Sequence, residues 1–214
     1  MDMLVIDNRI KRLTSLDTDV DPKLKRTLPK NVMVDSSNTL VIHPKDHTTD
    51  CLNVIYKDRN WSVIRNPDTP ESVVKKAIQS HHRIIMLGHG TPYGLLAAQG
   101  LNRFGRYIIN RNMVSLFKNK ETMSIWCFSN MFFEPANLKG LHTGMIISEL
   151  SEEWGVLGYA PLTKDKMAEN MERFCGAFAK HIDLEPEQMR EKVLEEYTGD
   201  DEVTQFNRKN IIVL

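Results

Sequence analysis

The sequence predicts an α/β domain in which helices cover both faces of a mainly parallel central sheet. Two short apolar runs carry this prediction, at residues 84–90 and 123–130, because each stops abruptly at small or polar residues. Apolar runs of this length between turn formers are typical of strands buried on both faces of a parallel sheet. Strand and helix patterns also alternate along the chain, as crossover connections require.

The first elements follow from local patterns. Residues 1–36 interleave basic and acidic side chains, which indicates a solvated arm or helical lead-in. β-Forming residues at 31–35 and 38–43 predict a hairpin. A Thr-Thr-Asp cap then predicts a short helix over residues 51–56.

The middle of the chain continues the alternation. Residues 61–65 form the next predicted strand, and a helix begins near Glu71, where a proline and an acid stand in the first turn. The strand that ends at His89 comes directly after this helix. These elements predict successive parallel strands joined by right-handed crossovers.

After His89 the patterns are shorter. Residues 95–98 fit a short strand or part of a hairpin, and residues 107–117 fit a crossover helix with a polar start. The strand ending at Cys127 is the fourth parallel member. A helix is then expected over residues 142–152 and a fifth strand over residues 155–159.

The last part is predicted to be mainly helical. Apolar residues recur at helical intervals over 166–181 and 186–197, and residues 211–214 form an edge strand. The arm is therefore followed by an α/β core over residues 37–162. Residues 163–214 supply C-terminal helices and a terminal strand packed on that core.

Composition limits the classes of function. The chain has 214 residues, and Lys+Arg 28 against Asp+Glu 28 give a formal net charge of +0, so no global field favours nucleic acid or an anionic membrane. Its apolar runs are all shorter than the roughly 20 residues that span a bilayer, which predicts a cytoplasmic protein. Cys51, Cys127 and Cys175 are an odd number without a CxxC pair, so reduced thiols are expected.

His89 and Cys127 are the candidate catalytic residues. If their strands are parallel neighbours, both residues leave the sheet at the same edge. Alone, a histidine after a strand often satisfies local hydrogen bonds, and a free cysteine is usually inert. Together, an imidazole can stabilise a thiolate and protonate a leaving amine. Gly90 allows close backbone approach, so that its N–H can bind an oxyanion.

This arrangement resembles the caspase, gingipain and separase superfamily of cysteine peptidases, including the bacterial CHAT-type members. The resemblance covers roughly residues 40–159 in strand order, and its motifs are His89-Gly90 and Cys127-Phe128-Ser129. It implies a three-layer caspase-like sandwich, a His89–Cys127 dyad, and an oxyanion hole made by the N–H groups of Gly90 and Cys127. Trp126 stands where relatives commonly carry Ala, Gly or an acid, so the side-chain specificity stays open.

Other candidate groups are weaker. His43, His47 and Cys51 are spaced as helical metal ligands would be, but Pro44 interrupts that helix, so no metal is expected.

Three further polar residues stand near the predicted crevice. His142 fits a supporting base or a helix-start histidine. Glu149 and Asn130 can reach the crevice, but the sequence assigns them no role.

The leading hypothesis is a cysteine endopeptidase that acts on proteins or peptides and needs no cofactor. Cys127 is then expected to be accessible and partly ionised, with Cys51 and Cys175 buried. One alternative is a non-catalytic caspase-like module that binds a regulatory protein partner. The other is an unrelated flavodoxin-like ligand binder with His and Cys at its strand ends.

Overall fold

The computed structural model describes residues 38–97 and 106–214. Every element below lies within residues 31–214, which belong to one compact unit. The predicted arm over residues 1–36, including the strand expected at residues 31–35, lies outside the described residues.

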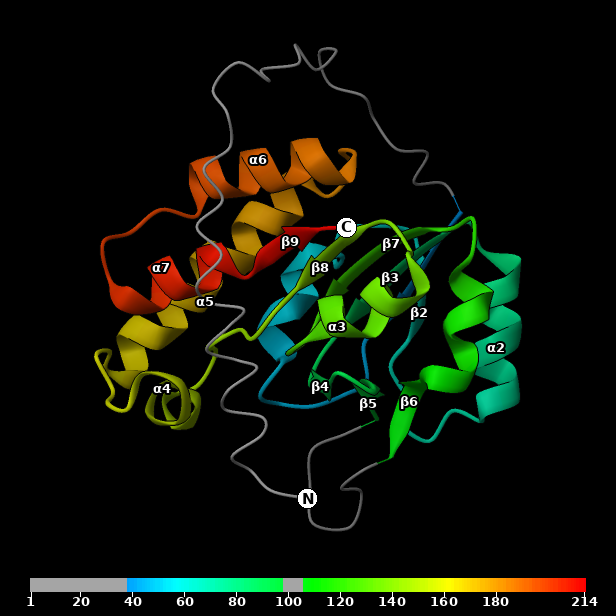
Figure 1. The fold of residues 1–214 in the computed structure, drawn as a ribbon, viewed down its shortest axis with the longest axis horizontal. Coiled ribbons are helices and arrows are strands. Elements are labelled where there is room, and N and C mark those ends of the chain that lie inside the picture. The colour runs from blue at the N-terminus through cyan, green and yellow to red at the C-terminus, as the bar shows by residue number, and fades with distance from the viewer. Residues whose placement is uncertain (1–37, 98–105) are drawn as a thin grey trace. The chain divides into compact units, whose positions relative to one another are not determined.

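A six-stranded sheet forms the centre of this unit, in the order β2-β1-β3-β7-β8-β9 (Figure 1). The first five strands in that order are parallel, and the last pairs antiparallel with its neighbour. Their bounds are β1 (Thr39–Ile42), β2 (Ser62–Ile64), β3 (Arg83–Leu87), β7 (Glu121–Ile125), β8 (Leu141–Thr143) and β9 (Ile211–Val213).

A second, three-stranded antiparallel sheet branches from the end of β3. It has the order β4-β5-β6, with β4 (Gly90–Thr91), β5 (Gly94–Leu96) and β6 (Tyr107–Asn110). Gly94 adopts φ 148°, and a Cβ there would lie 1.9 Å from the carbonyl oxygen of Ile109. Glycine at this position therefore lets β5 and β6 approach closely.

Helices pack against both faces of the large sheet. Val41, Ile85 and Met123 share one buried cluster with residues of η3, α5, α6 and α7, whereas Leu40 and Ile84 face a second cluster with residues of α2, η4 and α3. The bounds are η3 (Asp50–Ile55), α2 (Glu71–Ser80), η4 (Arg111–Phe117), α3 (Ser129–Phe133), η5 (Glu134–Ala136), α4 (Leu150–Leu157), α5 (Lys164–His181), α6 (Pro186–Glu196) and α7 (Glu202–Lys209).

The continuous apolar run of β3 explains this layering. Ile84, Ile85, Met86 and Leu87 are each 0 % exposed, and successive side chains point to opposite faces of the sheet. Each buried side chain of this kind contributes about 1.5–3 kcal/mol. The prediction of an α/β domain with a mainly parallel sheet covered on both faces is confirmed.

The predicted helix over residues 107–117 is wrong in its first half. Residues 107–110 form β6, where Ile109 pairs with Leu95, and only the following residues coil as η4. The side chain of Asn110 accepts a hydrogen bond from the N–H of Asn112 and so caps η4. Asn110, one of the polar residues near the start of the predicted helix, is thus the N-cap of the shorter helix η4.

The elements expected over residues 142–152 and 155–159 are also wrong, because strand and helix are exchanged. The fifth parallel strand is β8, at the start of the first range, and α4 covers most of the second. Glu149 and Glu152 form a capping box that begins α4, and Gly158 ends it with φ 81°. Gly158 thus ends a helix, whereas the sequence pattern predicts it within a strand.

The hairpin expected for residues 38–43 does not fit either, since both edges of β1 are occupied by β2 and β3. The C-terminal predictions are confirmed. Helices α5 and α6 match the expected ranges, and β9 forms the edge of the sheet. Helix α7 lies between α6 and β9 in the chain and begins at Glu202, with Asp201 as its N-cap.

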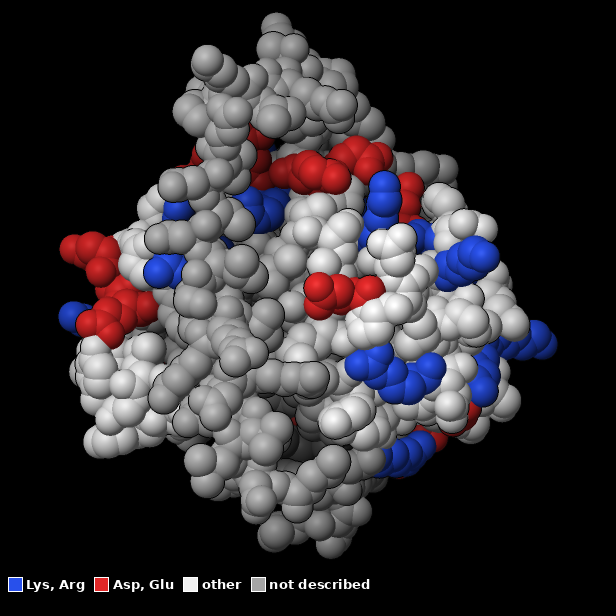
Figure 2. Space-filling model, in the orientation of Figure 1, with Lys and Arg blue, Asp and Glu red and all other residues white. Residues whose placement is uncertain are grey.

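Charged side chains of both signs are interspersed over the described part of the face in Figure 2. Of the helices in the described ranges, none is both long enough and apolar enough to cross a bilayer.

Candidate active site

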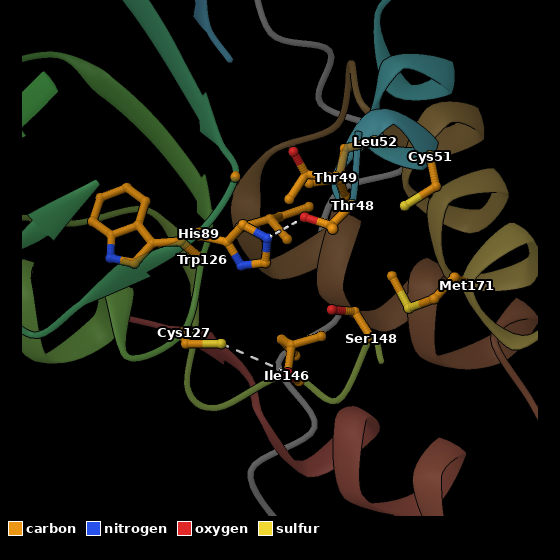
Figure 3. A pocket seen from close by; sticks show the side chains of 12 residues that line it. Thr48, Thr49, Cys51, Leu52, His89, Trp126, Cys127, Ile146, Ser148 and Met171 are labelled. Atoms are coloured by element: carbon orange, nitrogen blue, oxygen red, sulfur yellow. Dashed lines mark hydrogen bonds between the residues drawn. The ribbon is translucent and has the colours of Figure 1, made fainter. Parts of the chain in front are cut away.

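His89 and Cys127 follow neighbouring parallel strands at corresponding positions. β3 and β7 pair through Leu87 and Ile125, and each candidate residue comes two positions later. Both residues line one small cavity of about 30 Å³ (Figure 3), room for about one or two water molecules. The structure therefore brings the imidazole and the thiol to the same edge of the sheet.

Two hydrogen bonds of the Thr48 hydroxyl determine the tautomer of the neutral His89 ring. The hydroxyl of Thr48 donates to Asp46 Oδ1 at 2.8 Å, so its oxygen must accept from the His89 ring, whose Nε2 lies at 2.6 Å. This arrangement places the ring proton on Nε2 and leaves Nδ1 as the basic nitrogen. In Figure 3 that second nitrogen lies on the Cys127 side of the ring.

The turn that carries Thr48 is itself ordered by Asp46. The backbone N–H of Thr48 donates to Asp46 Oδ1 at 3.1 Å, so one carboxylate oxygen binds both the amide and the hydroxyl of the same residue. The Asp46 side chain is 7 % exposed. This local Asx-type turn explains why an Asp-x-Thr sequence follows the end of β1.

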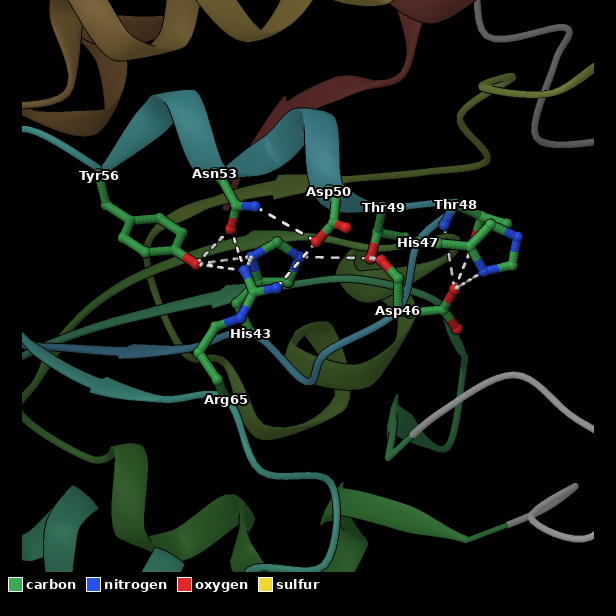
Figure 4. A network of polar contacts seen from close by, with 9 residues as sticks. All are labelled: His43, Asp46, His47, Thr48, Thr49, Asp50, Asn53, Tyr56 and Arg65. Atoms are coloured by element: carbon green, nitrogen blue, oxygen red, sulfur yellow. Dashed lines mark hydrogen bonds and ion pairs between the residues drawn. The ribbon is translucent and has the colours of Figure 1, made fainter.

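A partly buried polar network holds the adjoining residues in place (Figure 4). Arg65 Nη1 donates to His43 Nδ1 at 3.2 Å, so His43 carries its proton on Nε2, which donates to Thr49 Oγ1 at 3.2 Å. Arg65 Nη2 also donates to Asp50 Oδ1 at 2.8 Å. Burial, followed by the charge of Arg65, lowers the pKa of His43 to about 4. His43 is a neutral structural residue at neutral pH.

This network includes His43, one of the three residues whose spacing in the sequence is that of helical metal ligands. Both ring nitrogens of His43 are engaged, and the His47 side chain is 93 % exposed. Over residues 38–97 and 106–214, no three His, Cys, Asp or Glu side chains gather as metal ligands would.

Cys127 occupies a tight turn between β7 and α3. The flanking amides are both bonded, Trp126 N–H to Thr143 Oγ1 at 3.2 Å and Phe128 N–H to the Gly144 carbonyl at 2.9 Å. Phe128 adopts φ 67° and ψ 28°, which costs a non-glycine residue about 1–2 kcal/mol. Strain of this kind concentrates at functional sites.

Ser129, the last residue of the Cys-x-Ser motif, has a structural role. Its buried Oγ accepts from Thr143 N–H at 2.8 Å and lies 3.0 Å from the Thr143 carbonyl, to which it donates. The residue thus joins the start of α3 to β8 and fixes the turn around Cys127.

The Cys127 thiol is not ionised in this conformation. It is half-buried, and its S–H donates to the Ile146 carbonyl at 3.6 Å rather than to His89. Burial, with a further contribution from the charge of Glu152, raises the pKa of Cys127 to about 12. The expectation of an accessible, partly ionised Cys127 is therefore wrong for this state.

The close packing of the Trp126 ring against the backbone requires a glycine at position 90. A Cβ on Gly90 would lie 2.1 Å from Trp126 Cδ1, and the indole N–H donates to the Thr91 carbonyl at 3.2 Å. Trp126 is 1 % exposed. The tryptophan before the cysteine thus packs under the strand that carries Gly90.

The remaining polar candidates lie apart from the cavity. His142 is in β8 rather than at a helix start, its Nδ1 is hydrogen-bonded to Ser124 Oγ at 2.7 Å, and burial lowers its pKa to about 3. Its ring stacks on Phe133 at 4.4 Å. Glu149 caps α4, and Asn130 lies in α3. Thr48 and Asp46 are the site residues that the sequence analysis missed.

No protein-family model, curated protein or solved structure matches this chain.

Proposed function

We propose that the protein is a cysteine peptidase with Cys127 as nucleophile and His89 as acid and base. The observation that carries the proposal is that both residues leave adjacent parallel strands into one cavity, with the basic nitrogen of His89 on the Cys127 side. The strained turn after Cys127 adds support. A mainly parallel sheet flanked by helices on both faces is compatible with the three-layer sandwich that the resemblance implies.

In the proposed reaction the Cys127 proton moves to His89 Nδ1, and the sulfur attacks the scissile carbonyl. The N–H groups of Gly90 and Cys127 donate to the oxyanion. His89 then protonates the leaving amine, and water hydrolyses the thioester. Thr48 holds the opposite ring nitrogen throughout, so the imidazolium keeps a hydrogen-bond acceptor at Nε2.

The described conformation is a closed form in this proposal. A thiol with a pKa of about 12 is ionised in only about one molecule in 10⁵ at pH 7. A cavity of about 30 Å³ also admits no peptide. Catalysis therefore requires that Ile146 and its neighbours move away, which hydrates the thiol and lets His89 approach it.

The test is cleavage of a mixed peptide library, together with a search for self-cleavage, by wild type, Cys127→Ala, His89→Ala and the double variant. All three variants should lose activity by about the same factor, because the two residues act as a unit. Cys51→Ala is the matched control, since it removes a sulfur from the wall of the same cavity. Full activity in Cys127→Ala would refute the mechanism.

The second candidate is a non-catalytic caspase-like module that binds a regulatory protein partner. The protonated Cys127 thiol favours it, since a buried thiol bonded to a carbonyl is a stable structural state. Limited iodoacetamide labelling separates the two candidates. A peptidase that opens should label Cys127 in the native chain, whereas a module should label it only after unfolding.

A further inference from the structure

The two other cysteines lie side by side. Cys51 is on η3 and Cys175 is on α5, two elements that pack against each other, and each thiol has the largest single influence on the pKa of the other. Residues so far apart in sequence meet here only because α5 covers the sheet face on which η3 lies. Two of the three thiols in this chain are therefore placed within reach of one another.

The two thiols differ in environment. Cys51 is exposed, so the expectation that it would be buried is wrong, whereas Cys175 is buried as expected. The interaction between the two thiols lowers the pKa of Cys51, whereas the same interaction, followed by burial, raises the pKa of Cys175 well above its usual range. An accessible thiol of lowered pKa beside a second, protected thiol is the arrangement of a reactive cysteine and its resolving partner.

The pair also borders the candidate active site. Cys51 lines the same cavity as His89 and Cys127, and so does Met171, one helical turn before Cys175 on α5 (Figure 3). Thr48, which binds the His89 ring, is three residues before Cys51. A covalent change at Cys51 therefore acts on the wall that orients the imidazole.

We propose that Cys51 and Cys175 are a redox modification site, at which a hydroperoxide converts the two thiols to a disulfide that ties η3 to α5. The Cys51 thiolate attacks the outer peroxide oxygen, the O–O bond breaks, and a sulfenic acid and an alcohol, or water, are formed. Cys175 then attacks the Cys51 sulfur, the S–O bond breaks, and water leaves. The peroxide is reduced by the two electrons that the thiols lose.

The disulfide fixes one wall of the cavity. Opening of the site requires movement around His89 and Cys127, and a bond between η3 and α5 removes part of that freedom. The oxidised protein therefore exposes Cys127 less often than the reduced protein does. Control of peptidase activity by this bond rests on the proposed function, whereas formation of the bond does not.

The experiment treats the reduced full chain with hydrogen peroxide under native conditions, blocks free thiols and maps tryptic peptides without reduction. The expected product joins the peptides 46–57 and 174–180, which carry Cys51 and Cys175. The peptide 121–139, which carries Cys127, should remain unlinked. Dithiothreitol should reverse the link.

Three variants make the result specific. Cys51→Ser and Cys175→Ser should each abolish the link, and Cys127→Ser should retain it. Cys51→Ser changes an exposed side chain, so it serves even if the buried Cys175→Ser variant does not fold. A link that includes Cys127, or Cys51 oxidised to the sulfinic acid without any link, would overturn the proposal.

A second measurement tests the effect on the cavity without a peptidase assay. Oxidation should slow iodoacetamide labelling of Cys127 in wild type and leave its rate unchanged in Cys51→Ser. An equal rate in oxidised and reduced wild type would show that the disulfide does not restrain the site. Peptidase inactivity of every sample would count against the proposed function but not against the disulfide.

Discussion

Acidification should destabilise this protein through two buried neutral histidines, His43 and His142. Burial lowers their pKa values from 6.5 to about 4 and about 3, respectively. The unfolded chain binds protons at both residues below pH 6.5, whereas the native state does not. Stability is therefore fully present above pH 6.5 and is lost as the pH falls toward the folded values.

The size of the loss follows from the same values. Between pH 6.5 and pH 5 each histidine contributes about 1.5 pH units at 1.36 kcal/mol per unit, or about 2 kcal/mol. The pair should thus remove about 4 kcal/mol, a large share of the 5–15 kcal/mol that holds a typical domain together. Glu121 and Glu153 offset part of this loss, because burial raises their pKa values and their protonation favours the native state.

The assay is urea unfolding of wild type and His142→Gln at a series of pH values from about 7.5 to about 5. The variant should be less stable at the higher pH, but its loss on acidification should be smaller than that of wild type by about 2 kcal/mol. His47→Gln removes an imidazole whose side chain is 93 % exposed and should keep the full loss. A free energy of unfolding that is flat over this range would refute the reasoning.

Four further substitutions probe the site and its surroundings. Thr48→Val removes the hydroxyl between His89 and Asp46, and kcat/KM should fall about tenfold to a hundredfold, as when an orienting partner is lost, while the chain stays folded. Gly90→Ala should cost about 3 kcal/mol or more in chemical denaturation, because its Cβ would lie 2.1 Å from the Trp126 ring. The matched change Gly176→Ala, where a Cβ meets nothing within 4 Å in α5, should instead stabilise by about 1 kcal/mol. Ser129→Ala leaves the backbone N–H of Thr143 without its acceptor and should cost about 1–3 kcal/mol by the same measurement.

The sequence predicted the structure best where a hydrophobic pattern was compatible with only one type of secondary structure. The run of β3 is apolar over residues 84–87, and the run that ends at Cys127 is mostly apolar, so both fit strands buried on both faces. Their ends placed His89 and Cys127 at one edge of the sheet. Residues 155–159, in contrast, are compatible either with a strand or with the end of a helix. Gly158 is equally suited to a turn after a strand and to the left-handed end of a helix, and the capping box at Glu149 decides for the helix.

The support of His89 could not be predicted in the same way. Thr48 is bound to the ring across 41 positions of sequence, and only the parallel order of β1 and β3 brings the two segments together. An Asp-x-Thr sequence after a strand indicates a turn but not what that turn will touch. The sequence also could not predict that the Cys127 thiol is protonated, because its hydrogen-bond acceptor is the carbonyl of Ile146, which follows β8 in the chain.

The short connection between the two sheets has a mechanical consequence. β3 ends at Leu87 and β4 begins at Gly90, so the chain passes from one sheet to the other within two residues, and His89 is one of them. The backbone that carries the imidazole is thus the connection between the two sheets, and its conformation is set by how the two sheets are oriented. A change in the angle between the two sheets would therefore also change the orientation of the ring relative to Cys127, which follows β7 of the large sheet.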